Sequence, residues 1–355
     1  MKPFALLFVH AALAVGGLSL HTQYQKDHAV RVEIDMTMSM DTETKMERDG
    51  QPVEGRGGMG GMSSDSEYKI VTVDQFVEVD GGKASKVKRH FEDVGGSRTM
   101  SFGEEERSND VESPVEGLTI VLSGDDSDPT IDVEDGKKPE DEHAFEHQRL
   151  SLFVDGALPT KDVEEGATWD LTKDQVLTIL HLDAHRGLFL PPQREGGEGR
   201  EGGEGGRRGG GGRFGGPGGS DLQLLLAADW KGKAKLTDAE EEVGGVKCAV
   251  IELELTASGE LPMPEMRGGG RRERMLEPEA SAFGNSYEIE LEGKLAYDLA
   301  AKRPQSLEVK GKLSNTMDME REGREGGTVK MHTERSGKFE LKVKVSDEKA
   351  ESKGK

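Results

Sequence analysis

The sequence has few of the residues that build a large packed core. Only 33% of its 355 residues are hydrophobic and 5% are aromatic, whereas glycine alone occupies 49 positions. Because burial of apolar surface must offset the entropy lost on folding, part of the chain is expected to stay unpacked. The length corresponds to one large domain or two ordinary ones.

Cysteine is almost absent. Cys248 is the single cysteine, so no disulfide can form within the chain. It lies in the apolar run from Val246 to Leu255, which favours a small buried side chain over a nucleophile. A protein of this size does not need a disulfide to fold, so the low cysteine content is compatible with export.

Long apolar runs and excess positive charge are also missing. No stretch of 18 apolar residues occurs, so we expect no membrane-spanning helix. The 47 Lys and Arg are outnumbered by 69 Asp and Glu, which gives a net charge of -22. Such a chain repels phosphate, which argues against a nucleic-acid partner. The Arg–Gly stretch around Arg207 resembles RNA-binding segments, but neighbouring glutamates cancel most of its charge.

The N-terminus has the layout of a secretory signal peptide. A positive start at Lys2 is followed by an apolar stretch from Phe4 to Val15 and then by small residues. This pattern predicts that residues 1–22 form a signal peptide, with cleavage between Ala14 and Tyr24. We therefore expect an exported protein, periplasmic or extracellular. The alternative is a buried N-terminal helix.

Alternating hydrophobicity predicts long β-strands. From Val30 to Met40 every second residue is apolar and the residues between them are polar, which places one face in a core and the other in water. The same alternation recurs at 68–79, 117–123, 246–256, 287–299, 307–319, 329–333 and 339–345. Short connections make the last four of these an antiparallel meander, with a turn at Ser336 and Gly337. The expected fold is mainly β, with long antiparallel strands in a curved sheet or half-barrel.

Helices and unpacked segments complete the predicted organisation. Short helices are expected at Glu140–Val154 and at Lys173–Leu182, the second capped by Thr172 or Asp174. The tract from Gly196 to Gly219 holds 15 glycines in 24 residues, which predicts a disordered insertion. The expected parts are thus a signal peptide at 1–22, a β-rich domain made of 28–193 and 221–346, the insertion at 194–220 and a charged tail at 347–355.

Three sequence motifs resemble a known group of proteins. Residues 158–169 read LPTKDVEEGATW, residues 245–253 read GVKCAVIEL, and residues 291–299 read LEGKLAYDL. These motifs are similar to elements of uncharacterised secreted bacterial β-sheet proteins, and they cover about half of the mature chain. The resemblance implies a curved sheet, similar to the half-barrels of periplasmic lipoprotein carriers. It implies no activity and no site residues.

Two histidine pairs are the candidate metal ligands. His143, Glu146 and His147 fit the H-x-x-E-H pattern of zinc peptidases, in which an α-helix places both histidines on one face. A third ligand is required, and the helical scaffold of such peptidases is not predicted here. His181 and His185 have the same spacing, for which a polar helix face is the favoured interpretation over a metal site. We therefore assign no catalytic, cofactor or metal residues.

Methionine is unusually common on the predicted buried face. Met36, Met38, Met40, Met317, Met319 and Met331 all occupy inward positions of the alternating strands. Methionine is flexible and adapts to varied apolar partners. We expect an exported, non-enzymatic protein with a structural or binding role, whose concave sheet face takes an apolar small molecule or lipid. The alternatives are a simple core, a metal-dependent hydrolase at His143, and an interaction protein that works through its Gly/Arg tract.

Overall fold

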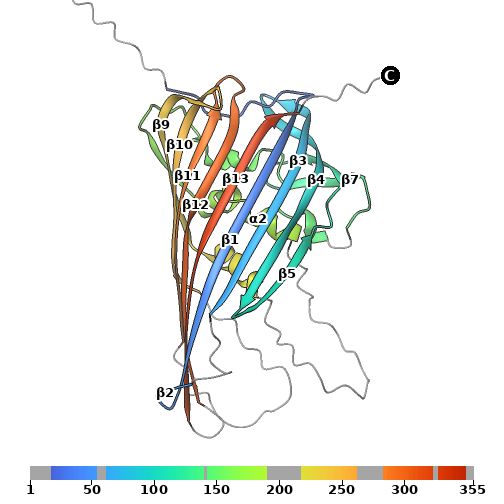
Figure 1. The fold of residues 1–355 in the computed structure, drawn as a ribbon. Helices are drawn as coiled ribbons and strands as arrows, with labels where there is room; N and C mark the ends of the chain where they lie inside the picture. The colour runs from blue at the N-terminus through green and yellow to red at the C-terminus, as the bar shows by residue number, and fades with distance from the viewer. Residues whose placement is uncertain are drawn as a thin grey trace, which may run out of the picture.

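The computed structural model describes residues 17–53, 61–139, 142–189, 217–261, 283–322 and 327–348. Within these ranges the chain is mainly β, as the alternating pattern predicts (Figure 1). The strands are β1 (Ala29–Arg48), β2 (Gln51–Pro52), β3 (Met62–Asp80), β4 (Lys83–Phe102), β5 (Glu105–Glu112), β6 (Thr119–Gly124), β7 (Pro129–Asp135), β8 (Thr168–Leu171), β9 (Trp230–Val243), β10 (Val246–Glu260), β11 (Phe283–Asp298), β12 (Arg303–Glu322) and β13 (Thr328–Asp347).

All 13 strands of the described ranges belong to one curved antiparallel sheet, which does not close within these ranges. Its order is β7-β6-β4-β3-β1-β13-β12-β11-β10-β9-β8, while β2 pairs with β1 and β5 pairs with β4. The first and last long strands lie side by side, in register from Val30 opposite Asp347 to Arg48 opposite Val329. The two expected parts of the β-rich domain, 28–193 and 221–346, therefore share a single sheet.

The curve of the sheet holds the core. Inward residues of β1 and β13, such as Ile34, Met38 and Leu341, are almost completely buried. Five short helical segments lie behind the strands within the curve (Figure 1). They are the 3-10 helices η1 (Glu142–Phe145) and η2 (Phe153–Ala157), and the α-helices α1 (Lys173–Ile179), α2 (Leu182–Phe189) and α3 (Pro217–Ala227). In the described ranges, no helix is long and apolar enough to cross a membrane.

Helix α1 begins where its cap predicts. The Thr172 side chain accepts a hydrogen bond from the Gln175 amide, and the Gln175 side chain accepts one from the Thr172 amide. This reciprocal capping satisfies two backbone donors that the first helical turn leaves free. The helix ends at Ile179 rather than at Leu182, because His181 adopts a positive φ of 55° that separates α1 from α2.

The expected α-helix at Glu140–Val154 is wrong. This stretch contains η1, an irregular segment and the start of η2. Two of its backbone donors find partners outside the stretch: the Ser151 amide donates to the Asp126 carboxylate, and the Leu152 amide donates to the Tyr24 hydroxyl. Because long-range side chains satisfy these groups, the segment does not need helical hydrogen bonds.

The expected turn at Ser336 and Gly337 is also wrong. Both residues lie inside the continuous strand β13, so the C-terminal region has one strand fewer than predicted. Gly337 stands opposite Met40 of β1 and Leu313 of β12. A Cβ atom at this position would overlap the Ser39 carbonyl oxygen and the Met40 sulfur. The glycine therefore allows the neighbouring strands to approach closely, and it does not mark a change of chain direction.

The fold begins before the expected domain start at 28. Leu18 pairs with Val163 through two backbone hydrogen bonds, and Leu20 is completely buried. Residues 17–22 thus belong to the folded domain although the sequence pattern assigns them to the signal peptide. At the other expected boundary, α3 starts at Pro217, inside the predicted 194–220 insertion. The rest of that insertion and most of the 347–355 tail lie outside the described residues.

Candidate functional site

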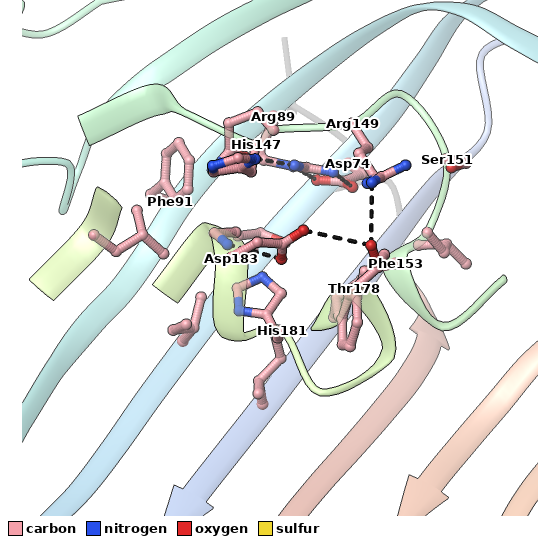
Figure 2. A pocket seen from close by; sticks show the side chains of 18 residues that line it. Asp74, Arg89, Phe91, His147, Arg149, Ser151, Phe153, Thr178, His181 and Asp183 are labelled. Carbon is pink, nitrogen blue, oxygen red and sulfur yellow. Dashed lines mark hydrogen bonds and ion pairs between the residues drawn. The ribbon is translucent and has the colours of Figure 1, made fainter. Parts of the chain in front are cut away.

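The candidate site is a small cavity, lined by both polar and apolar side chains, between the concave face of the sheet and the helices. Strands β1, β3 and β4 form one wall, and the 147–153 segment with α1 and α2 forms the other (Figure 2). Its volume is about 40 Å³. This is room for a few water molecules, whereas sites for drug-sized ligands enclose roughly 300–1,000 Å³. The inward methionines Met36, Met38 and Met40 of β1 are all buried and present no apolar surface to solvent.

An ion pair lies on the sheet side of the cavity. Asp74 and Arg89 lie directly opposite each other on β3 and β4, so the register of the sheet brings them together. Arg89 Nε and Nη2 donate to the two carboxylate oxygens at 2.8 and 2.6 Å. The pair is desolvated, with the Asp74 side chain 1% exposed and that of Arg89 12% exposed. Removal of either partner alone would leave a buried charge, which costs roughly 3–5 kcal/mol.

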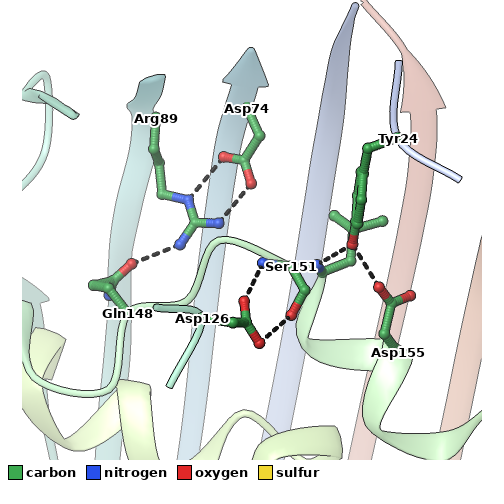
Figure 3. A network of polar contacts seen from close by, with 8 residues as sticks. Tyr24, Asp74, Arg89, Asp126, Gln148, Ser151 and Asp155 are labelled. Carbon is green, nitrogen blue, oxygen red and sulfur yellow. Dashed lines mark hydrogen bonds and ion pairs between the residues drawn. The ribbon is translucent and has the colours of Figure 1, made fainter. Parts of the chain in front are cut away.

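Two arginines connect the cavity walls. Arg89 Nη1 donates to Gln148 Oε1 at 2.7 Å, which ties β4 to the segment between η1 and η2 (Figure 3). Arg149 from the same segment donates to the Thr178 hydroxyl of α1 at 3.1 Å. The Thr178 hydroxyl in turn points to Asp183 Oδ2 at 3.4 Å (Figure 2). A chain of side-chain contacts therefore holds the helices against the sheet at this point.

Ring nitrogens of two histidines beside the cavity have no hydrogen-bond partner among the described residues. They are both nitrogens of the fully buried His185 and Nδ1 of His181. The His185 ring packs instead against Tyr68, edge-on with a centroid distance of 4.3 Å, and against Phe189. Burial, with smaller contributions from the charges of His181 and Arg98, lowers the pKa of His185 to about 3. Burial likewise lowers the pKa of His181 to about 4, against the opposing effect of Asp183.

A second polar cluster fastens the N-terminal segment over the helices. The Tyr24 hydroxyl donates to the carboxylate of Asp155 in η2 (Figure 3). The Thr22 hydroxyl donates to the same carboxylate at 2.6 Å. Asp126 accepts two hydrogen bonds from Ser151, at 2.6 and 2.9 Å. Burial raises the pKa of Asp155 to about 7, although the hydrogen bonds from Thr22 and Tyr24 act in the opposite direction.

The H-x-x-E-H residues do not take the arrangement that the zinc hypothesis requires. His143 lies in η1 and is largely exposed, with its ring in contact with the Glu146 carboxylate. His147 follows the end of η1, has a φ of 61° and lines the cavity from the helix side. The two histidines therefore do not share one face of an α-helix. Among the described residues, no three His, Cys, Asp or Glu side chains gather as a metal site would need.

The single cysteine, Cys248, lies in a buried, hydrogen-bonded position that does not favour reactivity. Cys248 is buried in β10, where its thiol donates to Gln305 Oε1 at 3.0 Å. Burial raises the pKa of this thiol, which keeps it protonated and unreactive. The Arg–Gly stretch around Arg207 lies outside the described residues. Neither a protein-family model nor a curated protein matches the sequence.

Sequence patterns alone do not reveal most of the polar groups in the cavity. No strand is predicted at 83–102, so the pairing of Arg89 with Asp74 is not expected from the sequence. One signal was present: Asp74 occupies an inward position of an alternating strand, between Thr72 and Phe76. A charged residue there needs a buried partner. The sequence does not show which residue supplies it.

Proposed function

We propose that this protein is an exported, non-enzymatic binding protein that takes up an amphipathic, lipid-like molecule between its curved sheet and its helices. The observation that carries the proposal is that some buried polar groups between the sheet and the helices have no hydrogen-bond partner among the described residues. Buried polar groups normally find hydrogen-bond partners, and each unpaired one costs roughly 1–3 kcal/mol. His181 and His185 leave three such nitrogens between the sheet and the helices.

Uptake requires the helices to move. The cavity of about 40 Å³ is far smaller than an acyl chain needs. Helices α1 and α2 have only 7 and 8 residues, and side-chain contacts such as Arg149–Thr178 connect them to their surroundings. When they shift outward, the buried apolar residues of β1, β3 and β13 become the wall of a binding groove. The polar head of the ligand then has His185 and Arg149 as partners.

Export is inferred from the N-terminal sequence pattern, and the contacts of the N-terminal segment support a cleavage site before Leu18. Leu18, Leu20 and Thr22 pack into the domain. Cleavage after residue 22 would remove these contacts and expose apolar surface of the core. We therefore propose that processing leaves Leu18 on the mature chain, which places the cut between Ala14 and Leu18.

The binding proposal is tested with a fluorescent fatty acid. The native protein should bind this probe saturably. Met38→Asp puts a charge on the inward face and should abolish binding, whereas Thr37→Asp alters the neighbouring residue on the exposed face and should leave binding unchanged. His185→Phe provides a second variant. It removes both unpaired nitrogens, so it favours the closed state and should weaken binding.

The folded state of each variant is checked by far-UV circular dichroism. Absence of saturable binding to the native, β-structured protein would overturn the proposal. Equal binding by the native protein and a folded Met38→Asp variant would show that the probe sits elsewhere. If only Met38→Asp fails to fold, the His185→Phe result decides, because unchanged affinity there would contradict uptake beneath the helices.

A further inference from the structure

The far ends of three long strands extend beyond the helices. The lower parts of β1, β12 and β13 continue past the helical segments and form a narrow tip, with β2 at its end (Figure 1). Antiparallel pairing holds this tip in register: β1 pairs with β13 as far as Arg48, and β12 pairs with β13 as far as Glu322. None of the helices in the described ranges covers the inward face of the sheet at this tip (Figure 1).

The rows of side chains on this face change character toward the tip. Residues directly opposite each other in a sheet lie on the same face, so the register defines the rows across β1, β13 and β12. Counting outward, they are Met40–Gly337–Leu313, then Thr42–Arg335–Asn315, then Thr44–Thr333–Met317, and finally Met46–Met331–Met319.

Polar contacts separate the outermost row from the core. The Thr44 and Thr333 hydroxyls lie 3.2 Å apart, and Arg335 Nε donates to the Thr42 hydroxyl at 3.4 Å. The core thus ends at the Met40 row, and the three methionines of the tip form a separate apolar row. Each of them is only half-buried, so solvent reaches the row.

The register brings the three thioethers together. Met331 lies directly opposite Met46 on one side and directly opposite Met319 on the other. Cβ atoms of such pairs are roughly 4.5–5.5 Å apart, and the sulfur of methionine stands two bonds further out on a flexible stem. Both outer side chains can therefore lean over Met331. Met317 supplies a fourth sulfur on the same face, one row nearer the core.

Apolar packing alone does not explain this choice of residue. Isoleucine and valine favour strands, whereas methionine has no special preference for them. The thioether is instead a neutral, soft ligand that selects Cu(I) over hard or borderline cations. The net charge of -22 also raises the local concentration of cations around the chain.

We propose that Met46, Met319 and Met331 form a binding site for a soft monovalent cation, Cu(I) or its analogue Ag(I). The site lies at the tip, beyond the part of the inward face against which the described helices pack, and does not depend on the proposed uptake of a lipid-like ligand. It involves no redox step, because the cation binds in its reduced form.

The test uses the full mature chain with Cys248→Ala, which removes its only thiol. Methionine methyl groups are labelled with carbon-13, and silver nitrate is added in chloride-free buffer. One equivalent of Ag(I) should shift the methyl signals of Met46, Met319 and Met331. The signals of Met36 and Met38 in the core should stay in place, and Zn(II) should shift none of them.

Two matched substitutions make the test decisive. Met331→Leu keeps an apolar side chain of similar size but removes the central sulfur, so it should weaken Ag(I) binding at least tenfold. Met36→Leu is the same change in the core and should leave the affinity unaltered. The proposal fails if Ag(I) shifts no methionine signals saturably, if the shifts occur at the core methionines, or if the folded Met331→Leu variant binds as tightly as the parent chain.

Discussion

Replacement of His185 by phenylalanine should make the protein markedly more resistant to acid. His185 is fully buried, and in the part of the chain that the structure describes neither of its ring nitrogens has a hydrogen-bond partner. Its pKa is about 3 in the folded protein, against an ordinary value of 6.5 when the chain is unfolded. Between these two values the unfolded chain binds one more proton than the folded chain at this position. Stability therefore falls as the pH drops below 6.5.

The size of the effect follows from the same pKa values. At pH 5 the folded histidine is neutral and the unfolded one is protonated, and pH 5 lies about 1.5 pH units below 6.5. Each unit corresponds to about 1.36 kcal/mol, so His185 alone lowers the free energy of unfolding by about 2 kcal/mol between pH 8 and pH 5. Any folded pKa below about 4 gives the same figure at pH 5.

The assay is urea-induced unfolding of the native protein and His185→Phe at both pH values. Phenylalanine adds volume and removes two unpaired nitrogens. The difference in the free energy of unfolding between variant and native protein at pH 8 therefore reflects packing and desolvation, and it is not itself the test. The change in that difference between pH 8 and pH 5 should be about 2 kcal/mol in favour of the variant. An identical loss of stability in both proteins would refute the claim that His185 is held neutral by burial.

Asp155 provides a control of opposite sign. Its pKa is raised to about 7, so the folded state keeps a proton that the unfolded state loses above about pH 4. Stability from this group is present at low pH and is lost as the pH rises through 7. Asp155→Asn should therefore gain stability relative to the native protein on going from pH 5 to pH 8, whereas His185→Phe gains in the other direction.

Three further predictions concern the strand contacts, the N-terminus and the histidine motif. Gly337→Ala should lower the free energy of unfolding by about 1–3 kcal/mol, because its Cβ would overlap the Ser39 carbonyl oxygen; Gly284→Ala is the control, since the nearest atom to its Cβ is 3.9 Å away. Mass spectrometry of the protein from its own host should find a mature N-terminus between Val15 and Leu18, and an intact Met1 on most molecules would contradict export. Chelation of divalent metals should leave the melting temperature unchanged, and a stoichiometric metal that His147→Ala removes would instead favour the hydrolase hypothesis.

Much of the fold could be predicted because its signals are local. Alternation along β1, β3, β10 and β12 specifies strand character and the inward face, since successive side chains point to opposite sides. The cap at Thr172 likewise depends on residues only three positions apart. Each of these features rests on neighbours along the chain, so the sequence shows them without knowledge of the fold.

Strand β4 shows where local patterns fail. Its buried residues Val87, Phe91 and Val94 are spaced four and three positions apart, which is the spacing of a helix rather than a strand. Shifts in its register with β3 account for this spacing, because an extra residue reverses the alternation of faces. Such a bulge depends on the partner strand and leaves no clear mark in one segment.

The sequence by itself determined the strand-rich composition, the acidic charge and the alternating apolar faces. Tertiary structure decided which polar residues meet inside. Asp74 finds Arg89 through pairing of β3 with β4, and Arg89 finds Gln148 across 59 residues of chain. His185 is uncharged because the sheet and the helices exclude water from it, not because of any neighbour in sequence. These contacts join distant segments, and only packing of the whole chain sets their distances and their dielectric surroundings.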